Sequence, residues 1–177
     1  VCTLLAEWMA AEGITVHRVE NNLWAECGDG PETILLNAHI DTVKPSVSYT
    51  RNPFDGEYDG QTIYGLGAND DGGSVIAMLA VFIDMMHAPI PGKRIVLTLT
   101  AEEENSGRKG IELLLPEIGP IDYAIVGEPT SLEMAVAERG LLVLDCEAKG
   151  KAGHAAREEG INALYIALED IQTLRNY

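Results

Sequence analysis

Residues that can bind a cation follow several apolar segments of this sequence. Four segments or turns run directly into such residues: His39 with Asp41, Asp70, Glu103 with Glu104, and Glu128. Carboxylates that gather closely repel one another unless a cation or a proton neutralises them, so the set predicts a metal site. One imidazole with carboxylates and no thiolate suits divalent ions such as Zn²⁺, Co²⁺ or Mn²⁺.

Spacing within two of these groups predicts separate roles for their members. His39 and Asp41 are two residues apart, so in an extended segment their side chains project to the same side. Asp41 can then orient the imidazole through its second ring nitrogen. Glu103 and Glu104 are adjacent and point apart. One can therefore bind a metal while the other acts as a general base.

Each of these residues also has a purely structural explanation. Asp70 or Asp71 would cap a helix that begins at Gly72, and Glu102 reads as a solvated surface charge. The turn 65–67 (GLG) is similar to part of a dinucleotide-binding loop. The third glycine position of that loop is Asp70, however, and two carboxylates there would repel a pyrophosphate. The metal site is favoured by the whole set, because four acidic segment ends occur in order.

The segments that must position these residues alternate between strands and helices. Strands are predicted at Ile14–Val19, Asn22–Glu26, Thr33–Asn37, Arg94–Thr100 and Tyr123–Gly127, and helices at Thr3–Ala11, Gly72–Met86 and Gly110–Leu115. The last three strands are expected to be buried. This alternation indicates an α/β fold with a mostly parallel sheet flanked by helices. The carboxyl ends of strands in such a sheet line one crevice, which brings the acidic segment ends together.

A change of pattern near residues 137–140 predicts a second domain. Leu141–Ala148 alternates in polarity as a half-exposed strand does, and a helix is predicted over Ile161–Leu174. We therefore expect residues 1–138 to form the N-terminal part of a catalytic domain. Residues 139–177 are expected to begin a second, α+β domain that this chain does not complete.

Composition excludes some partners. Among 177 residues, 28 are acidic and 12 are basic, which gives a formal charge of −16. Such a surface repels phosphate backbones and anionic headgroups, so we expect neither nucleic acid nor membrane as a partner. The apolar stretch at Val75–Met86 contains Asp84 and is shorter than the roughly 20 residues needed to span a bilayer. Three widely separated cysteines favour a reducing, cytoplasmic location.

Five blocks of this sequence resemble the metallopeptidases that include aminoacylase, acetylornithine deacetylase and succinyl-diaminopimelate desuccinylase. The blocks are LLNAHIDTV (35–43), YGLGANDDGGS (64–74), LTAEEENSG (99–107), AIVGEPTS (124–131) and GKAGHAA (150–156). They occur in the family's order and nearly the whole chain fits between them. The sequence of the VGEPTS block is most similar to that of the acetylornithine deacetylase type. The resemblance implies a zinc-exopeptidase-like catalytic domain followed by a lid domain.

The resemblance also implies a site with two divalent metal ions, with Zn²⁺ as the first expectation. In that site His39, Asp70 and Glu128 hold one ion. Asp70 bridges to the second ion, which Glu104 also binds. The peptide bond that follows the bridging aspartate is usually cis in the family.

Three further roles come from the same resemblance. Glu103 is implied as the general base, and Asp41 as the partner that orients His39. His154 matches a lid histidine that contacts the substrate of a neighbouring subunit, which implies a homodimer formed through the lid. Without the resemblance, His154 would read as an ordinary loop histidine beside Gly153.

The sequence departs from the family pattern in two places. The family usually has Asp-Met-Lys-Gly where this chain has DDGG at 70–73, so a lysine near the ligands is absent. The family's final metal ligand is a histidine that follows the lid in a chain about twice as long. We therefore expect this sequence to be the N-terminal portion of a longer enzyme that continues past Tyr177.

These features predict metal-dependent hydrolysis of the amide bond of N-acyl amino acids. The leading expectation is deacetylation of N-acetylornithine in arginine biosynthesis, with a small-molecule N-acyl amino acid as the partner. A dipeptidase or carboxypeptidase would use the same site. The alternative to an enzyme is a non-catalytic fragment that binds metal or serves in assembly. It is considered because the family's last metal ligand is missing from this sequence.

Overall fold

The computed structural model describes residues 1–137, 139–157 and 159–177. The chain divides into two units, Val1–Met134 and Ala135–Tyr177. The second unit contains the short helix η2 (Ala155–Arg157) and the helix α4 (Ala163–Arg175). The predicted boundary after residue 138 falls on a residue outside those described, and it stays a prediction.

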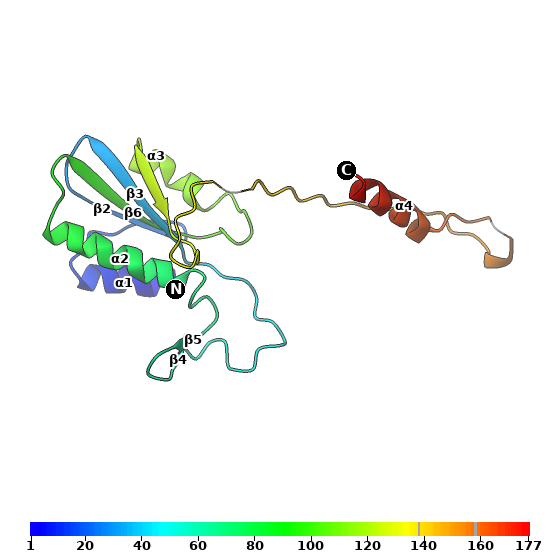
Figure 1. Ribbon diagram of the computed structural model, residues 1–177, viewed down its shortest axis with the longest axis horizontal. Coiled ribbons are helices and arrows are strands. Elements are labelled where there is room, and N and C mark those ends of the chain that lie inside the picture. The colour runs from blue at the N-terminus through cyan, green and yellow to red at the C-terminus, as the bar shows by residue number, and fades with distance from the viewer. Residues whose placement is uncertain (138, 158) are drawn as a thin grey trace. The chain divides into compact units, whose positions relative to one another are not determined.

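A five-stranded mixed sheet lies at the centre of the first unit (Figure 1). In spatial order its strands are β1 (His17–Val19), β2 (Asn22–Cys27), β6 (Lys93–Thr100), β3 (Glu32–His39) and β7 (Tyr123–Val126). β3 pairs in parallel with β6 and β7, whereas β2 pairs antiparallel with β1 and β6. Only part of the sheet is therefore parallel. The short turn at residues 20–21 can join β1 and β2 only as antiparallel neighbours.

Helices cover both faces of this sheet (Figure 1). On one face lie α1 (Cys2–Ala11) and α2 (Gly72–His87), which contribute Met9, Val75, Leu79 and Phe82 to the larger core cluster. On the other face lie η1 (Ile111–Leu113) and α3 (Leu115–Ile118), where Leu114 and Ile118 pack with Trp24, Leu35 and Val96. The sequence predicted a single short helix at Gly110–Leu115, whereas the structure has two short helices there, η1 and α3. Pro116 lies in the first turn of α3, where its missing N–H is tolerated.

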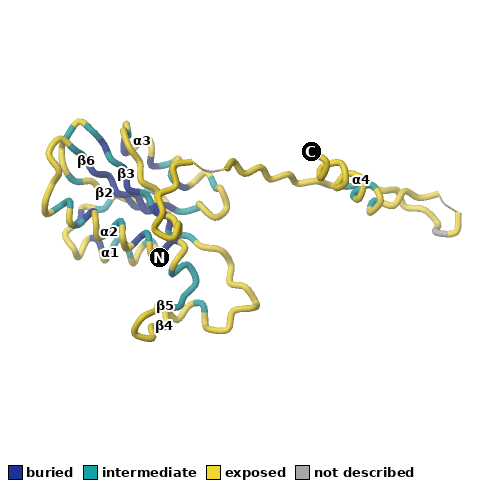
Figure 2. The backbone as a smooth tube through the Cα atoms, in the orientation of Figure 1, coloured by how far each residue is buried: buried dark blue, intermediate teal, exposed yellow. Residues whose placement is uncertain are grey.

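Burial is concentrated in the central strands β2, β3 and β6, as Figure 2 shows. A long and mostly exposed loop connects β3 to α2. It carries a small antiparallel hairpin of β4 (Glu57–Tyr58) and β5 (Ile63–Tyr64). Within the described ranges, no helix combines the length and the apolar character needed to cross a bilayer.

The strand β7 forms where it was predicted, but it is not buried. Tyr123, Ile125 and Val126 are 63%, 54% and 59% exposed. β7 lies at the edge of the sheet, and among the described residues it pairs with β3 alone. The prediction of a buried strand was wrong because an apolar run indicates a strand that is usually covered, whereas burial depends on the neighbouring elements.

The strand predicted at Leu141–Ala148 is absent from the described part of the second unit. Residues 141–148 form no ladder there, and Leu141 and Leu142 are exposed. A strand needs a partner for its backbone groups, and local alternation of polarity cannot supply one. By contrast, α4 forms within two residues of its predicted bounds. The Asn162 side chain caps it by accepting the N–H of Leu164 at 2.9 Å.

We expect Phe82→Ala to lower the free energy of unfolding by about 3–5 kcal/mol, because it opens a cavity in a packed core. Phe82 is 0% exposed on the buried face of α2. The matched control is Ile76→Ala on the same helix, where the side chain is 64% exposed and the change should stay within about 0.5 kcal/mol. Urea unfolding measures both variants. Equal losses in the two would contradict this core.

Candidate metal centre

The predicted metal ligands and the predicted base lie at one edge of the sheet, where the parallel strands end. His39 is the last residue of β3, Glu103 and Glu104 lie in the turn after β6, and Glu128 follows β7. Asp70 comes just before α2. Because β3, β6 and β7 run in the same direction, their carboxyl ends meet at this edge, as the sequence predicted.

Two overlapping groups of side chains offer ligand atoms that all lie within 4.8 Å of one another. The first group is His39, Asp70 and Glu104, and the second is His39, Glu103 and Glu128. His39 is buried and the carboxylates are exposed, so solvent reaches the acidic side. An imidazole nitrogen with several carboxylate oxygens fits a divalent metal ion. Asp70 occurs with Glu104 and Glu128 occurs with Glu103, while His39 belongs to both groups.

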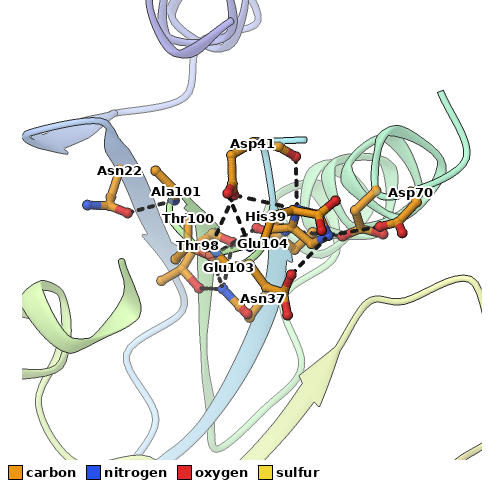
Figure 3. Close-up of polar contacts among 12 residues, drawn as sticks. Asn22, Asn37, His39, Asp41, Asp70, Thr98, Thr100, Ala101, Glu103 and Glu104 are labelled. Atoms are coloured by element: carbon orange, nitrogen blue, oxygen red, sulfur yellow. Dashed lines mark hydrogen bonds and ion pairs between the residues drawn. The ribbon is translucent and has the colours of Figure 1, made fainter. Parts of the chain in front are cut away.

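His39 is at the centre of both groups and is only 3% exposed. Its Nδ1 donates to the backbone carbonyl oxygen of Asp41 at 3.0 Å, and its Nε2 lies 3.0 Å from Oδ1 of Asp70 (Figure 3). A carbonyl oxygen can only accept, so Nδ1 carries the proton. In the neutral ring Nε2 then presents its lone pair to the carboxylates. That lone pair is what a metal ligand requires.

Asp41 contacts His39 in a different way from the one predicted. Its carboxylate oxygen Oδ1 lies 3.6 Å from His39 Nδ1, which is too long for a hydrogen bond, and its backbone carbonyl takes that place. The carboxylate instead accepts the backbone N–H groups of Glu103 and Glu104, each at 3.2 Å (Figure 3). Asp41 therefore connects the histidine to the loop that carries both glutamates.

Asp71, for which the sequence predicted no role beyond a helix cap and a charge that excludes pyrophosphate, contacts the candidate site. It is 1% exposed, and its Oδ2 accepts the backbone N–H of His39 at 3.1 Å. The contact joins the start of α2 to the end of β3. The peptide bond between Asp70 and Asp71 is cis, as the resemblance implied. A second aspartate directly after a candidate ligand was the available signal, but helix capping explained it equally well.

Asn37 was also missed, although it lies two residues before His39. Its side-chain amide donates to the hydroxyl oxygens of Thr98 at 2.9 Å and Thr100 at 3.1 Å (Figure 3). These contacts tie β3 to β6 directly below the acidic cluster. An asparagine within an apolar strand was the signal that could have found it, because a polar side chain in such a strand needs hydrogen-bond partners.

Burial and the neighbouring charges shift proton binding in the cluster. Burial raises the pKa of Asp71 and the pKa of Glu128, and the nearby charge of Asp71 raises that of Glu128 further. Burial by itself would lower the pKa of His39. Its contacts with the Asp41 carbonyl and the Asp70 carboxylate outweigh that effect, so the pKa of His39 lies above its ordinary value. These directions are those expected where negative charge is concentrated.

His154 belongs to the second unit and is exposed there. Its Nδ1 accepts the backbone N–H of Ala156 at 3.2 Å. This is a local contact within the loop before α4. The substrate-binding role of His154 therefore stays a prediction.

Curated proteins similar to this chain include two hydrolases. A succinyl-diaminopimelate desuccinylase of Paracoccus denitrificans is 35% identical over 170 residues, which cover 86% of this chain and 44% of that protein. A protein described as a LysW-lysine/LysW-ornithine hydrolase, of Pyrobaculum aerophilum, is 38% identical over 137 residues, which cover 76% of this chain and 36% of that protein. The chain thus spans less than half the length of these relatives.

The fold and the sequence profile agree with these similarities. A solved tripeptidase structure from Staphylococcus aureus matches with a TM-score of 0.61 and 25% identity, over 96% of this chain and 49% of that one. The profile of peptidase family M20/M25/M40 matches residues 35–169, which include every predicted site residue. The chain therefore belongs to peptidase family M20/M25/M40.

Proposed function

We propose that the whole protein hydrolyses the amide bond of N-acyl amino acids with two divalent metal ions, Zn²⁺ first among them. The observation that carries this proposal is the convergence of four carboxylates on the single imidazole of His39. One nitrogen and several oxygens form a donor set that suits Zn²⁺, Co²⁺ or Mn²⁺. The family membership supports the same chemistry.

The proposed ligands share Asp70. His39, Asp70 and Glu128 would hold one ion, and Asp70 with Glu104 would hold the other. Support comes from the contact between His39 Nε2 and Asp70 Oδ1, which brings the two ligand atoms within 3.0 Å of each other. Support also comes from the grouping of Asp70 with Glu104 around His39.

Glu103 is proposed as the general base. When bound, the divalent ions supply Lewis acidity, which polarises the substrate carbonyl and lowers the pKa of a water. The carboxylate of Glu103 reaches the cluster, with Oε2 3.9 Å from His39 Nε2, and its side chain is 52% exposed. It can therefore accept a proton from the attacking water at a carboxylate oxygen. It then returns that proton to the nitrogen of the departing amine.

The proposed substrate is an N-acylated diamino acid, with N-acetylornithine as the first candidate. The VGEPTS block supports an acetylornithine deacetylase type. The names of the two curated relatives give succinyl-diaminopimelate and LysW-lysine or LysW-ornithine, and each of these contains a diamino acid. We further propose that the whole protein forms a homodimer through the lid, with His154 contacting the substrate there.

A substrate panel tests the proposal. The protein is incubated with Zn²⁺ and with N-acetylornithine, N-succinyl-diaminopimelate or dipeptides, and the release of free amine is measured. We expect release from an N-acyl diamino acid that EDTA abolishes and added Zn²⁺ restores, because the ligands hold the metal reversibly. Release from dipeptides alone would favour the peptidase alternative. Bound Zn²⁺ with no turnover of any substrate would favour the non-catalytic alternative.

A further inference from the structure

One buried side chain ties both ends of the loop Ala101–Gly110, which carries Glu103 and Glu104, to the strand β2. Asn22 is 0% exposed. Its Oδ1 accepts the backbone N–H of Ala101 at 2.9 Å (Figure 3), and its Nδ2 donates to the backbone carbonyl of Lys109 at 2.8 Å. A single amide group therefore holds the start and the end of the loop together.

Glu102 closes the same loop from within. Its backbone has a φ of 63°, in the left-handed region that a non-glycine residue seldom adopts. Its carboxylate oxygen Oε2 accepts the backbone N–H of Lys109 at 2.9 Å, and its backbone carbonyl accepts the N–H of Gly107, also at 2.9 Å. Glu102 is thus part of the loop structure. The expectation that it is only a solvated surface charge was wrong.

Close packing at these contacts requires glycine at two positions. A Cβ on Gly107 would collide with the Glu102 side chain, and a Cβ on Gly110 would collide with the backbone carbonyl of Ala101. The two ends of the loop can approach each other only because neither glycine has a side chain. The loop sequence is therefore suited to the contacts that Asn22 and Glu102 make.

The charges of the loop explain why it needs such ties. Glu103 and Glu104 follow Glu102 directly; both contact the Asp41 carboxylate through their backbone N–H groups, and Glu104 is grouped with Asp70. Like charges at this spacing repel one another. A loop without these hydrogen bonds would therefore lower its electrostatic energy by moving its carboxylates apart. Asp41 holds the loop on the side of the site through two backbone N–H groups. Asn22 and Glu102 hold it on the side of the sheet.

We propose that Asn22 and Glu102 form a clamp that positions Glu103 and Glu104 for metal binding and proton transfer. Both are positioning residues, and their hydrogen bonds all go to backbone groups. The inference rests on the proposed function of the same site. Asn22 must accept from one N–H and donate to two carbonyls, of Val19 and Lys109, at the same time. An asparagine amide can do both, whereas an ionised aspartate can only accept.

The first test is Asn22→Asp. The variant keeps the acceptor for Ala101, but in place of Nδ2 it puts a carboxylate oxygen against the carbonyls of Val19 and Lys109. We expect its affinity for Zn²⁺, measured by calorimetric titration, to fall about 10- to 100-fold, as is usual when a group that supports a ligand is lost. With Zn²⁺ saturating, kcat should fall more than KM rises, because the base is misplaced while substrate contacts remain.

A control separates positioning from a general loss of stability. Asp122→Ala removes the carboxylate that accepts the backbone N–H of Thr33 at 2.7 Å, at the end of β3 away from His39. It should lower the melting temperature without changing the affinity for Zn²⁺. An equal loss of affinity in Asp122→Ala and Asn22→Asp would overturn the clamp, because general destabilisation would then explain both.

A second pair of variants avoids the buried core, in case Asn22→Asp does not fold. Glu102→Ala removes the acceptor for Lys109, whereas Glu102→Gln retains an acceptor oxygen without the charge. We expect Glu102→Ala to bind Zn²⁺ more weakly than the unsubstituted protein does. Glu102→Gln should recover the affinity for Zn²⁺. Wild-type affinity in Glu102→Ala, or an equal loss in both variants, would overturn the clamp. Absence of Zn²⁺ binding by the unsubstituted protein would instead contradict the proposed function.

Discussion

Replacement of Glu103 by glutamine is expected to lower kcat at least about 10²-fold while leaving the affinity for Zn²⁺ nearly unchanged. Glutamine keeps the size of the side chain and one acceptor oxygen, but its amide does not take up a proton in the relevant range of pH. The glutamate carboxylate reaches to 3.9 Å from His39 Nε2, beside the proposed ligands. Steady-state kinetics and calorimetric titration with Zn²⁺ measure the two quantities separately.

Glu112→Gln is the matched control for this variant. It removes the same charge by the same chemical change at an exposed residue of η1. Its kcat should equal that of the unsubstituted protein. If Glu103→Gln retained comparable activity, Glu103 would not be the base. If it lost Zn²⁺ binding together with activity, Glu103 would be a metal ligand instead, as its place in the group with His39 and Glu128 permits.

The second large effect is expected for His39→Ala, which should weaken the binding of Zn²⁺ by more than about 100-fold. That exceeds the usual loss for residues that only support a ligand. In both groups found among the described residues, His39 supplies the one nitrogen ligand. Its Nε2 lone pair faces the carboxylates because Nδ1 is committed to the Asp41 carbonyl.

Thermal unfolding with and without Zn²⁺ gives an independent measure of this prediction. A metal that binds only the folded protein stabilises it by about 2.7 kcal/mol when its free concentration is 100 times its Kd. The unsubstituted protein should gain this stability at a concentration of Zn²⁺ at which His39→Ala gains almost none. His87→Ala, at the exposed end of α2, is the control and should keep the full gain. Equal gains in both variants would remove His39 from the site.

The two predictions and the clamp depend on different parts of the same loop. Glu103 is expected to act in the reaction, and Glu104 to hold metal, while Asn22 and Glu102 keep the loop closed behind them. The three kinds of variant should therefore differ in their effects. Substitution of Glu103 should sharply lower turnover while metal is retained, substitution of His39 should sharply weaken metal binding, and substitution of the clamp should partly weaken both. Together they separate catalysis, binding and positioning at this edge of the sheet.

The sequence by itself determined where the cluster forms. Apolar strands ending at His39, before Glu103 and before Glu128 lie side by side in parallel in the structure. Parallel strands place their carboxyl ends at one edge whatever their exact bounds are, so the convergence survives errors in those bounds. The sequence by itself also determined the family to which the chain belongs. Each of the five family blocks is a short local pattern, so it can be found without the structure.

Only the tertiary structure decided how that cluster is held. The amide of Asn22 bonds to Ala101 and Lys109, which are 79 and 87 residues further along the chain. The exposure of β7 and the missing strand at Leu141–Ala148 likewise depend on which neighbours lie beside them. Local spacing and periodicity indicate which secondary structure a segment can form. Hydrogen bonds and packing between distant segments depend on three-dimensional proximity, which no local pattern contains.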